Sequence, residues 1–338
     1  THTHTHTHTH TRHTQDIQLC THTQTHTHSL SHTHTHTHTH THTHTWLQAA
    51  VSGDVKPASL DYVPPLVYPG SNPPVQRFPL APEQVSWAVP LPEYAPVNYT
   101  HPAVAKQPVW ADPADPRSIR FNSKDEVDGK VVDRTTCHPD GIAVDASTGV
   151  PTNPFGRTGM TGRGLLGKWG VNQAADTVVT RWKRSADGGI LERDGKKVLE
   201  FVAIQRVDNG MWAVPGGFVD NGEDRATTNG REFMEEALGT TEMKLGEAEE
   251  ESLRSLFESG IIVARIYSED GRNTDNAWIE TTCVNFHDET GRHADKLRLK
   301  GGDDAKNARW MMAHGGLDLF ASHLRLLKLI VDHHGAYF

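Results

Sequence analysis

The sequence predicts an α/β protein in which a Pro-rich region and a region of short strands and turns precede a regular α/β pattern. Three observations lead to this prediction. Segments rich in β-branched and aromatic residues alternate with two helical patterns in the C-terminal half. Closely spaced prolines upstream are incompatible with long helices. Between these regions, Asp128-Gly129 and Asp140-Gly141 are typical of turns joining short strands.

The composition divides the chain into two unlike parts. The 338 residues include 24 His and carry a formal net charge of −9. Most of the His fall within residues 1–45, largely in strict Thr-His alternation, which cannot bury apolar surface. We interpret residues 1–45 as a disordered low-complexity tract encoded by a CA-dinucleotide repeat. Metal binding by His aligned along one edge of an extended chain is the alternative.

The remaining sequence is long enough for one large or two moderate domains with a hydrophobic core. Pro-rich residues 46–84 are predicted to be a linker, residues 85–175 the N-terminal lobe, and residues 176–338 the α/β domain. The acidic excess, which lies wholly after residue 45, argues against a nucleic-acid partner. No apolar run could span a bilayer, so we expect a soluble chain without a membrane segment. We also expect a monomer.

The three cysteines are far apart and form no Cys-x-x-Cys pair: Cys20, Cys137 and Cys283. This spacing fits neither a disulfide framework nor a zinc site and indicates a reducing, intracellular compartment. The chain begins at Thr1 and shows no targeting segment. A mitochondrial and a cytosolic location therefore both stay open.

The α/β region begins with strands at 178–182 and 198–205, separated by an Asp187-Gly188-Gly189 turn. A strand at 211–214 leads into Pro215-Gly216-Gly217. The remaining elements are helices at 224–238 and 247–258, strands at 261–267, 277–286 and 309–312, and an amphipathic closing helix at 321–331.

Three carboxylates on the first helix form the strongest candidate site. Glu232 and Glu236 are four residues apart and Glu235 lies between them, so all three project to roughly the same side. Like charges gathered in this way require an offset, which Mg²⁺ or Mn²⁺ supplies because these ions prefer oxygen ligands. We therefore predict a metal site at Glu232, Glu235 and Glu236. Arg231 is placed to pair with Glu223.

A solvated acidic helix face is the alternative interpretation of such a charge run. However, Gly217, Glu223 and the Arg231-Glu232-x-x-Glu235-Glu236 segment keep the spacing of the Nudix box, G-x5-E-x7-R-E-U-x-E-E-x-G-U, where U is a bulky apolar residue. The chain therefore resembles the Nudix hydrolases. It departs from the motif at Leu238, where the family has glycine, and at Gly239, which raises the question of how the helix ends.

Further runs resemble one branch of that family, the mitochondrial ADP-ribose pyrophosphatase type, and also the C-terminal Nudix module of ADP-ribose-gated melastatin-type cation channels. These runs are Gly156-Arg157-Thr158-Gly159, Gly162-Arg163-Gly164-Leu165-Leu166-Gly167, Asn273-Thr274-Asp275-Asn276-Ala277-Trp278 and Ala321-Ser322-His323. The resemblance implies a Nudix α/β/α sandwich with a mixed sheet, preceded by a smaller β-rich N-terminal lobe. Substrate would bind in the cleft between the two. The substrate-binding residues that it implies are Gly216, Gly217, Asp270, Arg272, Ser322 and His323. Gln173 replaces a histidine of the family.

The resemblance implies hydrolysis of the pyrophosphate bond of ADP-ribose to AMP and ribose 5-phosphate. Its catalytic residues would be Glu232, Glu236, Glu235, Arg231 and Glu223. The alternative is an ADP-ribose-binding sensor module of a cation channel, with or without residual hydrolysis. The intact Arg231–Glu236 segment favours hydrolysis, because vertebrate channel modules resemble the enzyme but carry a degraded form of it.

Overall fold

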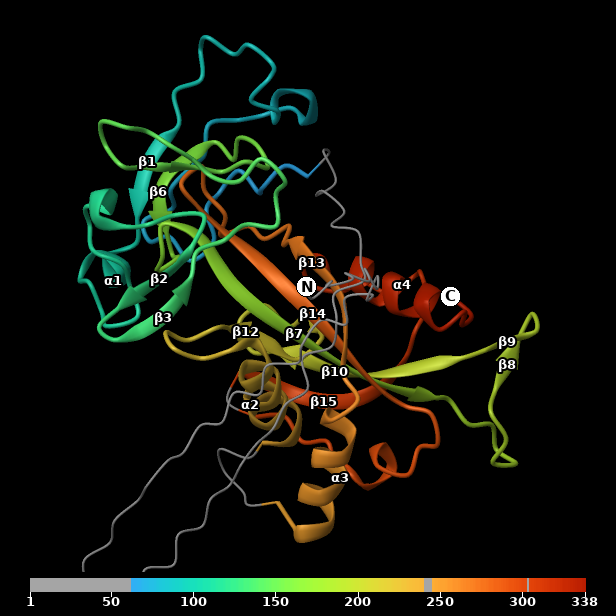
Figure 1. Cartoon of the computed structure of the whole chain (residues 1–338). Helices are drawn as coiled ribbons and strands as arrows, with labels where there is room; N and C mark the ends of the chain where they lie inside the picture. The colour runs from blue at the N-terminus through green and yellow to red at the C-terminus, as the bar shows by residue number, and fades with distance from the viewer. Residues whose placement is uncertain (1–61, 240–244, 303) are drawn as a thin grey trace, which may run out of the picture. The chain divides into compact units, whose positions relative to one another are not determined.

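The computed structural model describes residues 62–239, 245–302 and 304–338. The Thr-His tract at 1–45 therefore lies outside the described residues, as does the beginning of the predicted linker. A seven-stranded mixed sheet forms the centre of the fold, with the strand order β11-β10-β7-β14-β13, and with β12 paired to β7 and β15 paired to β10 (Figure 1). Its strands are β7 (Gly170–Trp182), β10 (Leu199–Arg206), β11 (Trp212–Ala213), β12 (Gly216–Phe218), β13 (Ile261–Tyr267), β14 (Ala277–Asp288) and β15 (Ala305–Met312).

Helices cover both faces of this sheet. On one face, α2 (Arg225–Leu238) and α3 (Glu247–Phe257) contribute Phe233 and Phe257 to an aromatic cluster that continues onto Phe286 of β14. On the other face, α4 (His323–His333) buries its leucines against Val178 and Phe201 in the main core. The two clusters come from opposite faces of the same strands, and the predicted α/β/α sandwich is therefore confirmed.

The long strands β7 and β14 run parallel to each other at the middle of the sheet. They stay in register from Gly170↔Ala277 to Asp288↔Arg181. The sequence predicted only residues 178–182 of β7, because the preceding residues include Asn172, Gln173 and Asp176. These polar side chains are buried but hydrogen-bonded; the Asn172 amide, for example, exchanges bonds with the Lys168 backbone. Internal pairing of this kind is invisible to a hydropathy pattern.

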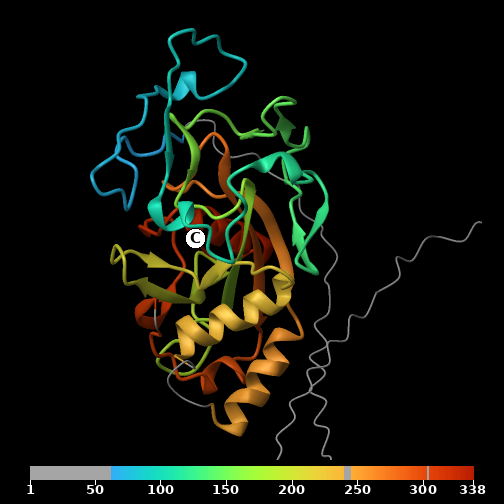
Figure 2. The ribbon, with the colours of Figure 1, turned by 90° about the vertical axis from the view of Figure 1, so that its left-hand side faces the viewer.

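The N-terminal lobe is built from short paired strands, which lie at the upper part of Figure 1 and are seen from the side in Figure 2. Asp128 and Gly129, both at positive φ, join one of its hairpins, as the sequence predicted. The predicted boundary between residues 175 and 176 lies inside β7, and the division into two lobes stays a prediction. The paired strands are β1 (Val97–Thr100) with β6 (Met160–Gly164), β2 (Lys124–Val127) with β3 (Lys130–Asp133), and β4 (Ala143–Val144) with β5 (Pro151–Thr152).

A further hairpin and several short helices complete the described elements. The hairpin pairs β8 (Glu192–Arg193) with β9 (Lys196–Lys197) and projects from the end of the sheet in Figure 1. The short helices are α1 (Pro102–Ala105) and the 3-10 turns at Pro82–Gln84, Pro116–Ser118 and Ala294–Lys296. Among the described residues, no helix is both long enough and apolar enough to cross a membrane.

The predicted linker over 46–84 does not describe residues 62–84, which pack onto the rest of the protein. Tyr68 and Arg77 are only 1% and 3% exposed. Proline excludes helix here but leaves an extended chain whose aromatic and cationic side chains can still be buried. The absence of helix in this Pro-rich segment is thus compatible with close packing.

Candidate active site

The candidate site forms where two neighbouring strands of the sheet separate. β7 and β10 pair only between residues 180–182 and 199–201. Beyond that point β12 pairs with β7, with Gly216 opposite Asp176, while β11 pairs with β10. Helix α2 packs against β12 and β7 at this opening. The glycine pair therefore lies directly beside the acidic helix.

At both positions, neighbouring atoms occupy the space that a side chain would need. A Cβ on Gly216 would lie 2.5 Å from the Ala175 carbonyl oxygen and 2.6 Å from Asp176 Oδ1. A Cβ on Gly217 would collide with the carboxylate of Glu232. The glycines thus allow β12 to approach both β7 and the carboxylates of α2.

Glu236 and Glu232 are the two most enclosed carboxylates of the predicted metal site. The Gly216 N–H donates to Glu236 Oε2 at 2.9 Å. Burial raises the pKa of Glu236 to about 8, and the charges of Glu232 and Asp304 act in the same direction. Burial also raises the pKa of Glu232, opposed by Arg231. Both carboxylates therefore lie where an additional positive charge would stabilise their ionised forms.

Arg231 joins the loop to the helix, as predicted. Its guanidinium pairs with Glu223 at 3.0 Å, with Glu232 at 2.8 Å and with Glu235 at 3.2 Å. The pKa of Glu223 is lowered: burial opposes this shift, but hydrogen bonds from Arg231 and Thr228 outweigh it. Arg231 thus orients three of the predicted catalytic carboxylates at once.

The donor set suits a hard divalent cation, although the side chains are not arranged as a closed metal site. Within the described ranges, no three Asp, Glu, His or Cys side chains converge closely enough to hold an ion. Glu232 and Glu235 instead contact Arg231, and Glu236 contacts a backbone N–H. All three offer carboxylate oxygens, the ligands that Mg²⁺ and Mn²⁺ prefer in proteins.

Asp270 and Arg272 lie together on the loop before β14. Arg272 donates to both carboxylate oxygens of Asp270, at 2.9 and 2.8 Å. Burial opposes ionisation of Asp270, but the Arg272 charge and hydrogen bonds outweigh it and lower the Asp270 pKa. The guanidinium also lies over the ring of Phe218, 5.3 Å from its centroid. Because Phe218 follows Gly217 on β12, this loop reaches the same edge of the sheet as the acidic helix.

Ser322 and His323, also predicted to bind substrate, are nearly buried at the start of α4. The Ser322 hydroxyl accepts the Glu269 N–H, and His323 Nδ1 accepts the Val214 N–H at 3.1 Å. Burial lowers the pKa of His323, and the charge of Asp176 opposes this shift. These contacts connect both residues to the backbone around β11 and the 268–270 segment, and their contact with substrate stays a prediction.

Sequence reasoning missed two charged residues of this region, Asp176 and Arg206. Asp176 is buried, accepts the Thr281 hydroxyl, and lies 3.7 Å from His323 Nε2; burial raises its pKa. Arg206 packs over Phe320 and pairs with Asp208. The available signal for Asp176 was an acidic residue inside an otherwise small and apolar stretch. Arg206 had no comparable signal, because cations commonly end strands.

Gln173, at a position where the family resemblance implies a histidine, makes hydrogen bonds that link separate segments of this chain. Its amide donates to the Thr135 carbonyl at 2.8 Å, and its oxygen accepts from Arg225. It thereby connects β7 to the loop after β3 and to the start of α2.

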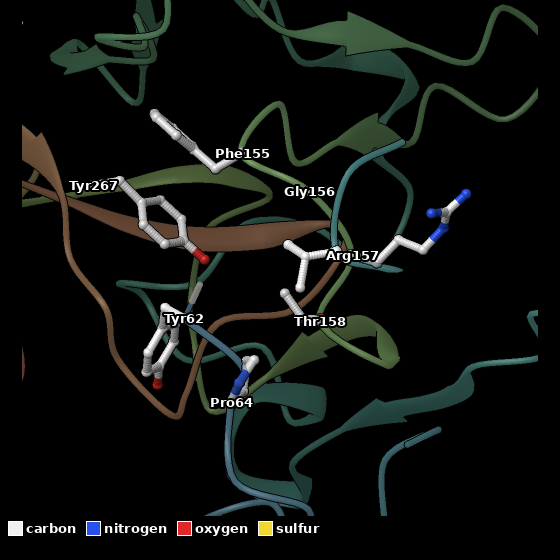
Figure 3. Close-up of a pocket in the computed structure, with 8 residues that line it drawn as sticks. Tyr62, Pro64, Phe155, Gly156, Arg157, Thr158 and Tyr267 are labelled. Carbon is white, nitrogen blue, oxygen red and sulfur yellow. The ribbon is translucent and has the colours of Figure 1, made fainter. Parts of the chain in front are cut away.

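A separate cavity lies between the N-terminal segment and the end of β13. It is lined by Tyr62, Pro64, Phe155 and Tyr267 among others, and Figure 3 shows the two tyrosines facing it (Figure 3). None of the predicted site residues lines this cavity.

Comparison with known proteins identifies the family. A model described as NUDT9-like, N-terminal domain, matches residues 80–170. The mitochondrial ADP-ribose pyrophosphatase of Rattus norvegicus is 44% identical over 278 residues, covering 80% of this chain and 77% of the relative. Putative nudix hydrolase 6 of Caenorhabditis elegans is 40% identical over 268 residues, covering 79% and 94%. The chain belongs to the Nudix hydrolases of the mitochondrial ADP-ribose pyrophosphatase type.

A channel protein is similar to the same Nudix hydrolase region. The transient receptor potential cation channel subfamily M member-like 2 of Nematostella vectensis is 44% identical over 277 residues; the match covers 80% of this chain but 17% of the channel. Among solved structures, the Nudix domain of NrtR from Shewanella oneidensis, crystallised with ADP ribose, aligns with a TM-score of 0.32 and 15% identity, covering 48% of this chain and 87% of that one. The predicted family is confirmed by the enzyme relatives.

Proposed function

We propose that this Nudix hydrolase cleaves the pyrophosphate bond of ADP-ribose, releasing AMP and ribose 5-phosphate. The observation that carries the proposal is the group of carboxylates around Arg231 beside Gly216 and Gly217, in the spacing of the Nudix motif. The substrate is suggested by the Rattus norvegicus relative, which is named for ADP-ribose. For this chain we further propose an intracellular, mitochondrial or cytosolic, monomeric enzyme with no nucleic-acid partner.

Each site residue has a role that its contacts support. Glu232, Glu235 and Glu236 would hold a divalent cation, Mg²⁺ or alternatively Mn²⁺, which supplies charge neutralisation of the pyrophosphate and acidification of water. Arg231 and Glu223 fix the orientation of these carboxylates. Glu232 or Glu236 would help to deprotonate or orient the attacking water. Arg272 pairs with phosphate or ribose oxygens.

The test is to incubate the full chain with ADP-ribose and Mg²⁺ and to measure AMP. Glu232→Gln should lower kcat by about 100-fold or more while leaving the melting temperature nearly unchanged. Glu250→Gln, an exposed position on α3, is the matched control and should keep full activity. Near-normal turnover by Glu232→Gln would contradict the assignment.

A second candidate function is ADP-ribose sensing without turnover, which the 44% identity to the anemone channel favours. The Arg231–Glu236 segment, complete in this chain, favours the enzyme. Calorimetric binding of ADP-ribose by a chain that releases no AMP in Mg²⁺ or Mn²⁺ would select the sensor.

A further inference from the structure

Residues 66–77, the ordered turn of the Pro-rich N-terminal region, form a small closed element. Val67 and Gln76 form an antiparallel bridge, and the Arg77 N–H donates to the Leu66 carbonyl at 2.8 Å. The Ser71 hydroxyl closes the turn by bonding the Tyr68 carbonyl and the Val75 N–H. This turn lies before residues 80–170, which the family model matches.

Arg77 is a buried cation whose hydrogen bonds go to backbone carbonyls. Its guanidinium donates to Thr158 at 2.9 Å, to Gly271 at 2.6 Å and to Asn273 at 2.9 Å. It also lies over the ring of Tyr68, 5.0 Å from the centroid. Burying a charge is unfavourable unless its hydrogen bonds are made. The Arg77 guanidinium therefore links the backbone at Thr158 to the backbone at 271–273.

Tyr68 completes the set of contacts to the same loop. Its hydroxyl donates to the Arg272 carbonyl at 2.8 Å and accepts the Leu165 N–H at 2.7 Å. The carbonyls of Gly271, Arg272 and Asn273 are thus all bonded by the 66–77 turn. In addition, Pro65 packs against Gly271, so the contact continues past the start of the turn.

Fixing three successive carbonyls fixes the peptide planes on both sides of the Arg272 Cα. The direction in which the Arg272 side chain leaves the backbone is then set by the 66–77 turn. Asp270 sets the rest of the side chain, because it accepts from both the Arg272 N–H and the guanidinium. The result is a guanidinium held over Phe218, one residue after Gly217.

We infer that the 66–77 turn is a positioning element for substrate binding, in which Arg77 and Tyr68 act through Arg272. The inference rests on the proposed function insofar as Arg272 contacts ADP-ribose. Neither Arg77 nor Tyr68 is assigned a contact with substrate. Changes to Arg77 or Tyr68 should therefore alter KM and the dissociation constant. They should leave kcat nearly unchanged, since the proposed catalytic carboxylates lie on a different element, α2.

The test compares Arg77→Met with Arg157→Met in the full chain. Arg157 is the matched control: it is also buried, donates to three carbonyls (Gln84, Ser86 and Val89) and stacks on Trp87 and Tyr94, but it bonds the 84–89 segment instead. Arg77→Met should raise KM for ADP-ribose roughly tenfold with kcat within about twofold. Arg157→Met should lower thermal stability and leave KM unchanged. Arg77→Lys should restore part of the affinity, because an ammonium group also donates to carbonyls.

A double-mutant cycle distinguishes positioning from a general loss of structure. In an Arg272→Ala background, Arg77→Met should raise KM no further, because the side chain through which it acts is gone. Additive effects, or an equal rise in KM from Arg157→Met, would overturn the inference. Tyr68→Phe keeps the ring and removes the bond to Arg272, so it tests the same point if Arg77→Met fails to fold; an unchanged KM there counts against the inference.

Failure of the proposed function gives a different result. A wild-type chain that releases no AMP contradicts hydrolysis, and the same variants are then compared by calorimetric dissociation constants for ADP-ribose. Roughly tenfold weaker binding by Arg77→Met but not by Arg157→Met supports the positioning role. Equal binding by the two variants, or no binding by the wild type, refutes it.

Discussion

Gly216 and Gly217 show how two adjacent residues of one type can carry different constraints. The space at Gly216 is closed by backbone, the Ala175 carbonyl, which cannot move without disturbing β7. The space at Gly217 is closed by the end of the Glu232 side chain, which can rotate away. One glycine therefore protects the fold and the other protects the position of a carboxylate.

Alanine substitutions should separate these two effects. Gly216→Ala should lower the free energy of unfolding by about 1–3 kcal/mol, because strand pairing must adjust. Gly217→Ala should stay within about 1 kcal/mol of the wild type but lose most of its turnover, because Glu232 is displaced. Urea unfolding and AMP release measure the two quantities. Gly189→Ala, where an added Cβ makes only ordinary contacts, is the control. Full activity of Gly217→Ala would show that the position of Glu232 is not critical.

Single residues also mark the limit of prediction from sequence. The spacing of Glu223 and Arg231 predicted their ion pair, because a loop followed by a helix leaves little freedom. The surroundings of His323 were not predictable in this way. Its partner is the N–H of Val214, a neighbour created by packing of distant segments. Contacts of this kind depend on the three-dimensional arrangement and have no local signature.

At the scale of elements, helix α2 begins and ends with defined caps. The Asp224 carboxylate accepts the Thr227 N–H at 2.8 Å. At the other end, Gly239 has φ 62° and ψ 37°, and its N–H donates to the Met234 carbonyl. The departure from the family motif at Leu238 and Gly239 therefore leaves a regular helix end, with glycine one position later in the left-handed conformation that suits it.

Both caps should contribute measurably to stability. Asp224→Ala should lower the free energy of unfolding by about 1 kcal/mol, because the Thr227 N–H loses its acceptor. Gly239→Ala should lower it by about 1–2 kcal/mol, because alanine is strained at this φ. Thr227→Ala, on the exposed side of the first turn, is the control and should change it by about 0.5 kcal/mol or less. Denaturant titration provides the values, and an unchanged midpoint for Gly239→Ala would contradict the role of the C-terminal cap.

Strands were less predictable than helices, and β7 shows why. Its C-terminal part, Val178–Trp182, has the β-branched pattern that sequence reasoning requires. Its N-terminal part buries amides and a carboxylate that are satisfied by hydrogen bonds to other segments. A helix can be predicted from its own periodicity and caps. A strand that buries polar side chains is stabilised by partners elsewhere in the chain, which the local sequence does not reveal.

At the scale of the whole molecule, acid sensitivity should depend on a histidine pair that joins α4 to the sheet. The rings of His287 and His334 pack in a tilted arrangement with centroids 4.3 Å apart, and His334 Nε2 bonds Asn285 Oδ1 at 2.7 Å. Burial lowers the pKa of His334 to about 4; nearby His287 and His333 add to this shift, and Glu289 opposes it. Because this folded-state pKa lies below the unfolded value of about 6.5, protonation of His334 destabilises the folded protein.

The resulting stability is complete above pH 6.5 and is lost as the pH falls from 6.5 towards 4. His334→Gln keeps a donor for Asn285 but cannot titrate, so the melting temperature of this variant should fall less steeply across that interval. His314→Gln, in the turn before α4, is the control and should keep the wild-type slope. Melting curves between pH 4 and 8 test this expectation. Identical slopes for wild type and His334→Gln would assign the acid sensitivity to other groups.

The pairing of β7 with β14 also has a consequence for biosynthesis. The Asn285 amide bonds the Val178 carbonyl 107 residues earlier in the chain. During translation the long central strand β7 therefore leaves the ribosome well before its parallel partner exists. Non-local parallel pairing is slow to form, and unpaired strand edges promote aggregation. Until β14 emerges, the edge of β7 that pairs with it is exposed. A chain truncated just before Ala277 should therefore aggregate or depend on chaperones.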